Sequence, residues 1–379
     1  MLLFISGSYP DSQDGIATGA KILLDAMLQH VKAEDVFLLT TDAPEIRRHL
    51  ESQTSVEYAL MPDWRVTPGN IRRIFRILDT YPIGAIHMEY PGNLYGKTFL
   101  ASFLPALVKL YNLRRRKHIA CHVRLHEFTQ ARFLRKVAIL PILLFASSLH
   151  VPSMKDRKTV AKIAGKRVKA TTIGTNIFVV PGQRQPSDQI TISYFGFVYH
   201  GKGIEQMLAL WQKLKAQDTE DKLRFRIIGD VGTEDTNHFA DYHRQVWRWL
   251  EEYGLKDSVS VTGYISDEEV SRELRNTDIA TVLYEDGLTL RRGSFLAYLA
   301  HGTPIITTQP DEEANALFAG HPGICMTWDQ TQMMQQILSW CELTPEQRAT
   351  IEQDNQALSQ HFAWDKIAQG FLKDYGILP

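Results

Sequence analysis

Short apolar runs alternate along this chain with longer segments in which apolar residues recur every three or four positions. The first run, 2–5, is continuous (LLFI), and the segment 16–30 that follows it has the spacing of an amphipathic helix. Continuous apolar runs are typical of strands buried on both faces of a parallel sheet. A period near 3.6 is typical of the helices that cover such a sheet. The alternation therefore predicts an α/β protein with parallel sheets.

The alternation starts twice, which predicts two domains. In the first half the predicted strands are 2–5, 35–40, 56–61, 85–88, 119–124, 149–151 and 169–173. In the second half they are 190–195, 224–228, 259–262, 279–284 and 305–308. The segment between the halves, 179–189, is rich in Pro, Gly, Gln and Ser, and we interpret it as the linker.

Composition agrees with an ordinary globular protein of 379 residues, since 44% are hydrophobic and 22% charged. The three cysteines are far apart and show no metal-binding spacing, which favours a reducing compartment. The N-terminus lacks a basic region before its apolar run, and the longest apolar run, 137–149, is too short to span a bilayer. We therefore expect a cytoplasmic protein without a transmembrane helix.

The net charge of −1 hides a strong asymmetry. The segment 109–169 contains sixteen Lys and Arg against two acids, Glu127 and Asp156, so it carries +14 while the rest carries −15. Such a segment attracts anionic partners. Two interpretations stay open: a core helix with a solvated basic face, and a segment that lies on an anionic membrane surface, which would make the protein peripheral to the membrane. Nucleic acid is disfavoured, because no recognition motif is present.

The segment 284–308 reads as a strand end, a basic loop, a helix and a buried strand. Gly293 and Ser294 stand at the predicted helix start, where free backbone amides and the helix dipole attract anions. Arg291 and Arg292 come directly before them and supply fork-shaped donors that suit phosphate. The alternative is a solvated basic turn with a Ser cap.

The second half contains further glycines at predicted strand ends. Gly196 follows the strand 190–195, and Lys202 stands just before the next helix, which suits a diphosphate although the Walker A spacing is missing. Gly229, Gly263 and Tyr264 follow two other strands. Because the carboxyl ends of parallel strands meet at one edge, these residues and the segment 284–308 are expected to form one site.

The first half offers a weaker set of candidates. Its first loop lacks the G-x-G-x-x-G pattern of dinucleotide binding, although Gly15 leaves room for a ligand beside the backbone. His87, Glu89, His126 and Glu127 all stand near predicted strand ends, where each suits acid–base work or hydroxyl binding. We favour the pair His126 and Glu127. A purely structural polar role is the alternative for each residue.

Several segments carry a family resemblance. The second half contains, in order, FGFVYHGKGIEQML, RIIGD, VTGYISDEEV and DGLTLRRGSFLAYLAHGTPIITT, and the chain closes with FAWDKIAQGFLKDY. With the Tyr-Pro…Gly loop near the N-terminus and the mid-chain His-Glu, these resemble the retaining glycosyltransferases of family 4, which have the GT-B fold. The resemblance implies two Rossmann-like domains facing across a cleft, with a C-terminal helix that crosses back to the first domain.

The resemblance also implies domain boundaries. They are an N-terminal acceptor-binding domain 1–178, a linker 179–189, a nucleotide-sugar-binding domain 190–358 and a returning segment 359–379. The sequence departs from the family at the usual Glu-x7-Glu element, where Ala297 takes the place of the second glutamate. An arginine is often found directly after the loop glycine, and here Phe197 follows Gly196. These departures weaken the assignment of sugar contacts and leave the phosphate-binding residues in place.

By resemblance, three residues are catalytic: Lys202 and Arg292 on the leaving diphosphate, and His126 at the acceptor or the sugar 6-position. The residues expected to bind the donor are Gly15, Gly196, Gly229, Gly263, Tyr264, Ile265, Asp286, Gly287, Gly293 and Ser294. Within this set, Gly293 and Ser294 would bind phosphate through amides, 263–265 would hold the base, and Asp286 with Gly287 the sugar. Glu89 and Glu127 are expected on the acceptor side.

The implied reaction moves a sugar from a nucleotide-diphosphate sugar to a saccharide or lipid-linked saccharide, with retention, in surface polysaccharide or glycoconjugate synthesis. Preorganised cations and amide dipoles stabilise the leaving diphosphate, so we expect no metal and no cofactor besides the nucleotide sugar as co-substrate. Two alternatives stay open. A nucleotide-sugar epimerase would consume donor without acceptor, and an inactive partner subunit of the same fold would bind nucleotide or glycan without turnover.

Overall fold

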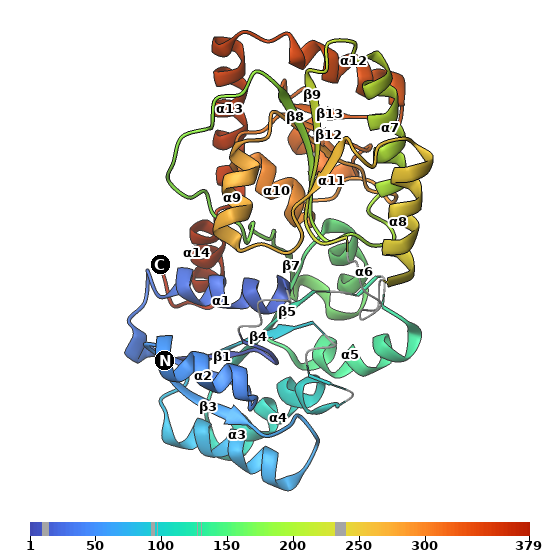
Figure 1. Ribbon diagram of the computed structural model, residues 1–379. Helices are drawn as coiled ribbons and strands as arrows, with labels where there is room; N and C mark the ends of the chain where they lie inside the picture. The colour runs from blue at the N-terminus through green and yellow to red at the C-terminus, as the bar shows by residue number, and fades with distance from the viewer. Residues whose placement is uncertain (10–14, 92–94, 97, 127, 130, 232–239) are drawn as a thin grey trace. The chain divides into compact units, whose positions relative to one another are not determined.

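The computed structural model describes residues 1–9, 15–91, 95–96, 98–126, 128–129, 131–231 and 240–379. Within them the chain forms two compact units, the first made of Met1–Asn176 with Ala363–Pro379 and the second of Ile177–Phe362. Each unit is built on a parallel sheet flanked by helices (Figure 1). The predicted pair of Rossmann-like α/β domains is therefore confirmed.

The sheet of the first unit has seven strands in the order β3-β2-β1-β4-β5-β6-β7, and its neighbouring strands pair in parallel. The strands are β1 (Leu2–Ile5), β2 (Val36–Thr41), β3 (Glu57–Met61), β4 (Ala85–Tyr90), β5 (Ala120–Leu125), β6 (Ser148–Val151) and β7 (Val168–Ala170). The helices are α1 (Gly15–Met27), α2 (Pro44–Gln53), α3 (Pro68–Thr80), α4 (Leu100–Arg115), α5 (Phe133–Phe145), α6 (Met154–Ala164) and α14 (Trp364–Asp374). Short 3-10 turns lie at Ala33–Asp35 and Gly165–Arg167.

The central strand β1 shows why both faces of this sheet must be covered. Its four residues are all apolar and all buried. Because side chains alternate along a strand, Leu3 and Ile5 belong to the core on one face, and Leu2 and Phe4 belong to the core on the other. The second core also contains Phe371 of α14.

Helix α14 belongs to the first unit and packs against α1, which confirms the predicted return of the C-terminal helix (Figure 1). Trp364 begins this helix, and its indole N–H donates to the Thr175 carbonyl at 2.8 Å. A Cβ added at Gly174 would lie 2.5 Å from the indole Nε1 of Trp364. Glycine at this position therefore lets the tryptophan ring dock against the backbone.

The sheet of the second unit has six strands in the order β10-β9-β8-β11-β12-β13, again paired in parallel. The strands are β8 (Ile190–Phe195), β9 (Leu223–Ile228), β10 (Val259–Val261), β11 (Ile279–Val282), β12 (Ile305–Thr307) and β13 (Ile324–Met326). The helices are α7 (Ile204–Gln217), α8 (Ala240–Glu252), α9 (Asp267–Arg275), α10 (Gly293–Ala300), α11 (Glu312–Phe318), α12 (Gln330–Cys341) and α13 (Pro345–Ser359). A 3-10 turn, Gln360–Phe362, ends this unit.

The segment 179–189 belongs to the second unit and is hydrogen-bonded to the region of α9. The amide of Val180 donates to Ser271 Oγ at 3.0 Å, and the amide of Gln185 donates to Asn276 Oδ1 at 3.0 Å. The chain returns to the first unit at Ala363, a few residues after the expected position at 359.

Some local expectations differ from the structure. The sequence patterns did not predict α2, α6, α11 and β13, which are short or mostly polar. The loop 288–292 was expected to be a polar, basic crossing, and this is wrong for Leu288 and Leu290, which are buried. Leu288 is held inward because its amide donates to the Gln309 carbonyl at 3.0 Å. Among the described residues, no helix combines the length and the apolar character needed to cross a bilayer.

Candidate active site

In the second unit, the strand order reverses between β8 and β11. Ligands of doubly wound sheets bind beside the carboxyl ends of the strands at this point. Gly196 follows β8 and Tyr284 follows β11, so the loops after these two neighbouring strands lie at the same edge of the sheet. The predicted site residues on these two loops or on the helix that follows are Gly196, Lys202, Asp286, Gly287, Arg292, Gly293 and Ser294.

Lys202 lies between two aromatic rings. Its Nζ is 5.0 Å from the centre of the Tyr199 ring and 5.7 Å from the centre of the Tyr284 ring. Burial, together with the positive charge of Arg292, lowers the pKa of Lys202 to about 8. The loop is pinned here because Gly203 has a φ of 61° and a Cβ at this position would lie 2.2 Å from the Leu283 carbonyl oxygen. Lys202 is therefore a partly dehydrated cation held at the end of β11.

Arg292 is the second cation of the site. Its guanidinium carbon lies 4.4 Å from the centre of the Tyr284 ring, so both cations lie near the same ring. The guanidinium forms an ion pair with Asp286 and donates to the Gly287 carbonyl at 3.2 Å. Its Nε is buried and has no hydrogen-bond partner within the described part of the chain. Two cations side by side repel each other, so the arrangement favours an anion between or beside them.

The start of α10 lies beside these two cations. Arg292 is the N-cap residue, and the helix begins at Gly293, as predicted. The Ser294 hydroxyl is hydrogen-bonded to the Tyr284 hydroxyl at 2.9 Å, which links the helix start to the ring that both cations approach. No atom lies within 4 Å of a Cβ built on Gly293, so a ligand has room to approach the backbone amides.

Some of the other glycines that were expected to bind the donor lie close to these residues. Gly196 and Gly229 have φ values of 136° and 150°, and a Cβ on Gly229 would lie 2.5 Å from the Gly196 carbonyl oxygen. The Gly229 amide donates to Thr262 Oγ1 at 3.1 Å, which joins the ends of β9 and β10. Gly263, Tyr264 and Ile265 follow β10, and the Tyr264 side chain is exposed. In the described residues, no ring contact or hydrogen bond joins Tyr264 to Lys202 or Arg292.

In the first unit, the residue that contacts His126 is Glu89. The Glu89 carboxylate is fully buried, is hydrogen-bonded to His126 Nε2 and lies 2.9 Å from His87 Nε2. Arg124 donates to it at 3.2 Å. Although burial alone would raise the pKa of Glu89, the positive charges of Arg124 and His126 outweigh this effect and hold the pKa well below its usual range. Glu89 is thus a charged group that orients His126, and it is not open to a substrate.

The remaining predicted site residues of the first unit are Glu127 and Gly15. Glu127, favoured together with His126 as a candidate, lies outside the described residues. Gly15 is the first residue of α1, and its carbonyl accepts a hydrogen bond from Asn176 Nδ2 at 2.8 Å.

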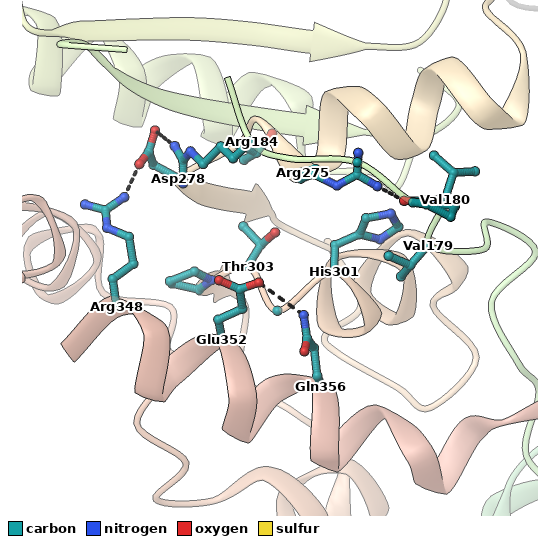
Figure 2. Close-up of a pocket in the computed structure, with 15 residues that line it drawn as sticks. Val179, Val180, Arg184, Arg275, Asp278, His301, Thr303, Arg348, Glu352 and Gln356 are labelled. Carbon is teal, nitrogen blue, oxygen red and sulfur yellow. Dashed lines mark hydrogen bonds and ion pairs between the residues drawn. The ribbon is translucent and has the colours of Figure 1, made fainter. Parts of the chain in front are cut away.

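A cavity of about 390 Å³ lies at the opposite edge of the second sheet (Figure 2). Its walls include Asp278 and Pro304, which stand at the amino ends of β11 and β12. Figure 2 shows Asp278 between Arg184 and Arg348, and it pairs with both. Because strand amino ends are not where such sheets bind ligands, we place the candidate active site at the carboxyl ends instead.

The sequence patterns missed three residues of the two sites: Tyr199, Tyr284 and Arg124. Both tyrosines supply ring faces to the cations, and Arg124 is the buried counter-charge of Glu89. An aromatic residue that directly ends a buried strand beside a basic loop would have been a usable signal for Tyr284. In the part of the chain that the structure describes, no three His, Cys, Asp or Glu side chains are grouped to hold a metal ion.

Residues 189–342, which lie within the second unit, match the family model described as Glycosyl transferases group 1. The matched segment covers most of the second unit. The sequence matches no curated protein. Lys202, Arg292 and the start of α10 lie within this matched segment.

The fold of the whole chain is similar to several solved structures. A glycosyltransferase from Rickettsia africae ESF-5 superposes with a TM-score of 0.75 at 14% identity, over 99% of this chain and 97% of that chain. HepE from Anabaena in complex with UDP superposes with a TM-score of 0.72 at 14% identity, over 100% of both chains. Sucrose-phosphate synthase from Thermosynechococcus elongatus gives 0.70 at 16% identity, over 99% and 98%. These likenesses concern the fold, which is GT-B, as the sequence resemblance implied.

Proposed function

We propose that this protein is a glycosyltransferase that moves a sugar from a nucleotide-diphosphate sugar to a saccharide or lipid-linked saccharide acceptor, with retention. The observation that carries the proposal is the pair of cations on the ring of Tyr284: Lys202 at 5.7 Å and Arg292 at 4.4 Å. The match of residues 189–342 to the Glycosyl transferases group 1 model supports the reaction class. Synthesis of a surface polysaccharide or glycoconjugate in the cytoplasm is the setting that we propose.

The leaving group of this reaction is a nucleoside diphosphate, which gains negative charge as the bond to the sugar breaks. Lys202 and Arg292 would stabilise that charge, together with the amides of Gly293 and Ser294. Because Lys202 is partly dehydrated, its interaction with the departing charge is stronger than in water. Removal of one such group typically lowers kcat by roughly 10²–10³.

His126 is the group that we assign to the acceptor side. Its imidazole is hydrogen-bonded to a carboxylate that is itself charged and buried, so its ring orientation and the position of its proton are fixed. A histidine oriented in this way suits proton transfer or a hydrogen bond to a sugar hydroxyl.

The test is binding of nucleoside diphosphates to the purified full-length protein, followed by calorimetry and thermal unfolding. UDP and UDP-glucose are the first ligands to use, because HepE, similar in fold, is described in complex with both. Other bases follow if UDP gives no shift. A ligand that binds only the folded state raises the melting temperature, so binding is read directly.

The variants Lys202→Met and Arg292→Met are expected to lose most of the shift. Their matched controls are Lys256→Met and Arg272→Met, because these cations of the same unit are exposed and pair with Glu251 and Glu268. Failure of every nucleoside diphosphate to bind, or equal binding by all four variants, would contradict the proposal. Turnover of donor without any acceptor would instead point to an epimerase.

A further inference from the structure

Helix α5 has two apolar faces. One face is buried in the core and includes Ile139, Ile142 and Leu143. The other faces solvent, and Phe133 and Leu134 at its start are 78% and 80% exposed. The remaining members of this exposed set are Val137, Leu140, Leu144 and Phe145. They recur every three or four residues, which places most of them on one stripe of the helix.

Helix α4 packs against α5 (Figure 1). It has a similar stripe of exposed apolar residues. Its exposed apolar residues are Phe99, at the N-cap, Phe103, Leu110 and Leu113. The two stripes adjoin, because Nζ of Lys109 on α4 lies 5.6 Å from the ring centre of Phe145 on α5. We call the ten exposed apolar residues on these two helices the α4–α5 face. Soluble proteins rarely expose so many large apolar side chains together unless the surface binds something.

The charges beside the α4–α5 face are of one sign. The segments 100–115 and 133–145 contain no Asp or Glu. The basic residues on or directly beside the two helices are Lys109, Arg114, Arg115, Arg116, Arg132, Arg135 and Lys136. Among these, within the described residues, only Arg115 pairs with a carboxylate, that of Asp79. The apolar stripe is therefore bordered by cations whose charge is largely not neutralised within the fold.

We propose that the α4–α5 face docks the first unit on a lipid bilayer that contains anionic phospholipids. Phe133 and Leu134 would enter the acyl region, and the basic residues would contact the phosphate headgroups. Long Lys and Arg side chains can reach such headgroups from a helix that lies in the interface. This docking surface goes beyond the transfer reaction, which requires no membrane.

Charge decides between this occupant and a second copy of the chain. Two α4–α5 faces placed together would bring like charges into contact, which is unfavourable at a protein interface. An anionic bilayer instead attracts each basic residue near its surface. The apolar stripe also distinguishes a bilayer from a purely polar polyanion, which would leave Phe133 and Leu134 unused.

The experiment is co-sedimentation of the full-length protein with vesicles of phosphatidylcholine alone, or with one quarter phosphatidylglycerol. The parent is expected to bind the anionic vesicles at least roughly tenfold more tightly than the neutral ones. Phe133→Ser with Leu134→Ser is expected to weaken binding to the anionic vesicles by about tenfold or more. The matched control is Val66→Ser with Trp328→Ser, since both side chains are about half exposed and lie outside the face. Arg132→Gln with Lys136→Gln is expected to remove most of the lipid-charge dependence.

Thermal unfolding of each variant verifies that the fold is retained, which is expected because the changed side chains are exposed. Three results would overturn the proposal. One is absence of binding to either vesicle. Another is equal loss of binding in the face variant and in the control. The third is a parent dimer in solution that the face variant converts to a monomer, which would assign the face to a second copy. Nucleotide binding in solution is tested separately, so the two proposals can fail independently.

Discussion

The fully buried carboxylate of Glu89 is hydrogen-bonded to the imidazole of His126 at the carboxyl end of the first sheet. The same carboxylate pairs with the buried Arg124. This relationship makes Glu89 a positioning residue. It also makes Glu89 a structural counter-charge.

Glu89→Gln is expected to reduce sugar transfer by roughly tenfold to a hundredfold, because the neutral amide no longer holds the His126 imidazole in the same orientation. The pH profile of kcat should change as well, and a purely structural role would not produce that change. Glu57→Gln is the control, since Glu57 is an exposed carboxylate of the same unit. Glu89→Ala should cost about 3–5 kcal/mol of unfolding free energy by leaving Arg124 buried without its partner.

Nucleoside diphosphate affinity is expected to fall as the pH rises through about 8, the lowered pKa of Lys202. Below that pH Lys202 is charged and attracts phosphate, and above it the neutral amine does not. Losing one charge-assisted contact should weaken binding by roughly 10–100-fold between pH 7 and 9.5. Calorimetry across this range measures the change. Lys202→Arg should bind with little pH dependence, and a parent that binds equally at both ends would contradict this role.

Asp286→Asn is expected to bind UDP about two- to fivefold more tightly than the parent, because Asp286 competes with phosphate for Arg292. The effect is small because the Asp286 side chain is 57% exposed and solvent screens the pair. If Asp286 also holds the donor sugar, the gain should be absent for UDP-glucose. Titration of both ligands separates the two roles, and weaker UDP binding would argue against competition.

Gly174→Ala is expected to destabilise the first unit by about 1–3 kcal/mol, because the new methyl group would overlap the indole of Trp364. Gly370→Ala is the matched control. Gly370 lies inside α14 with no atom within 4 Å of a built Cβ, so alanine there should stabilise by about 0.5–1 kcal/mol. Denaturant unfolding of both variants provides the comparison, and equal effects would contradict the role of the tryptophan contact.

Acid is expected to weaken the first unit. The His122 ring stacks on Tyr375 at 4.1 Å, and burial, helped by the positive charge of His87, lowers the pKa of His122 to about 4. Between pH 6.5 and 4 the unfolded chain binds a proton at this position and the folded chain does not, so stability falls as the pH falls. The loss is about 3 kcal/mol for this one group. His122→Asn should show a smaller loss between pH 7 and 4, and an identical pH dependence would exclude His122 as the cause.

Much of the fold could be predicted from the sequence, because buried parallel strands form continuous apolar runs. Strands such as β8 were predicted to the residue. Elements such as β13, with three residues, are too short for any period to appear. Helix α2 is mostly polar and was missed for that reason. The loop residues Leu288 and Leu290 were misjudged because their burial depends on a backbone pairing with a segment some twenty residues later.

Part of the candidate site could be predicted from the sequence. The positions of Lys202, Arg292 and Gly293 follow from their places after strands and before helices, which local sequence shows. The approach of both cations to the ring of Tyr284 depends on which strands neighbour each other, and that is not local. The contact between His126 and Glu89 is likewise not local, because Glu89 lies on the neighbouring strand β4.

Because α14 belongs to the first unit, that unit is made of two pieces of chain separated by the whole of the second. On a ribosome, the seven-stranded sheet is synthesised long before the helix that covers part of one of its faces. The second unit is continuous and has all of its residues available before α14 emerges. The first unit therefore cannot complete this core until the second unit has been translated. Until then, the apolar residues that pack against Trp364 and Phe371 stay uncovered.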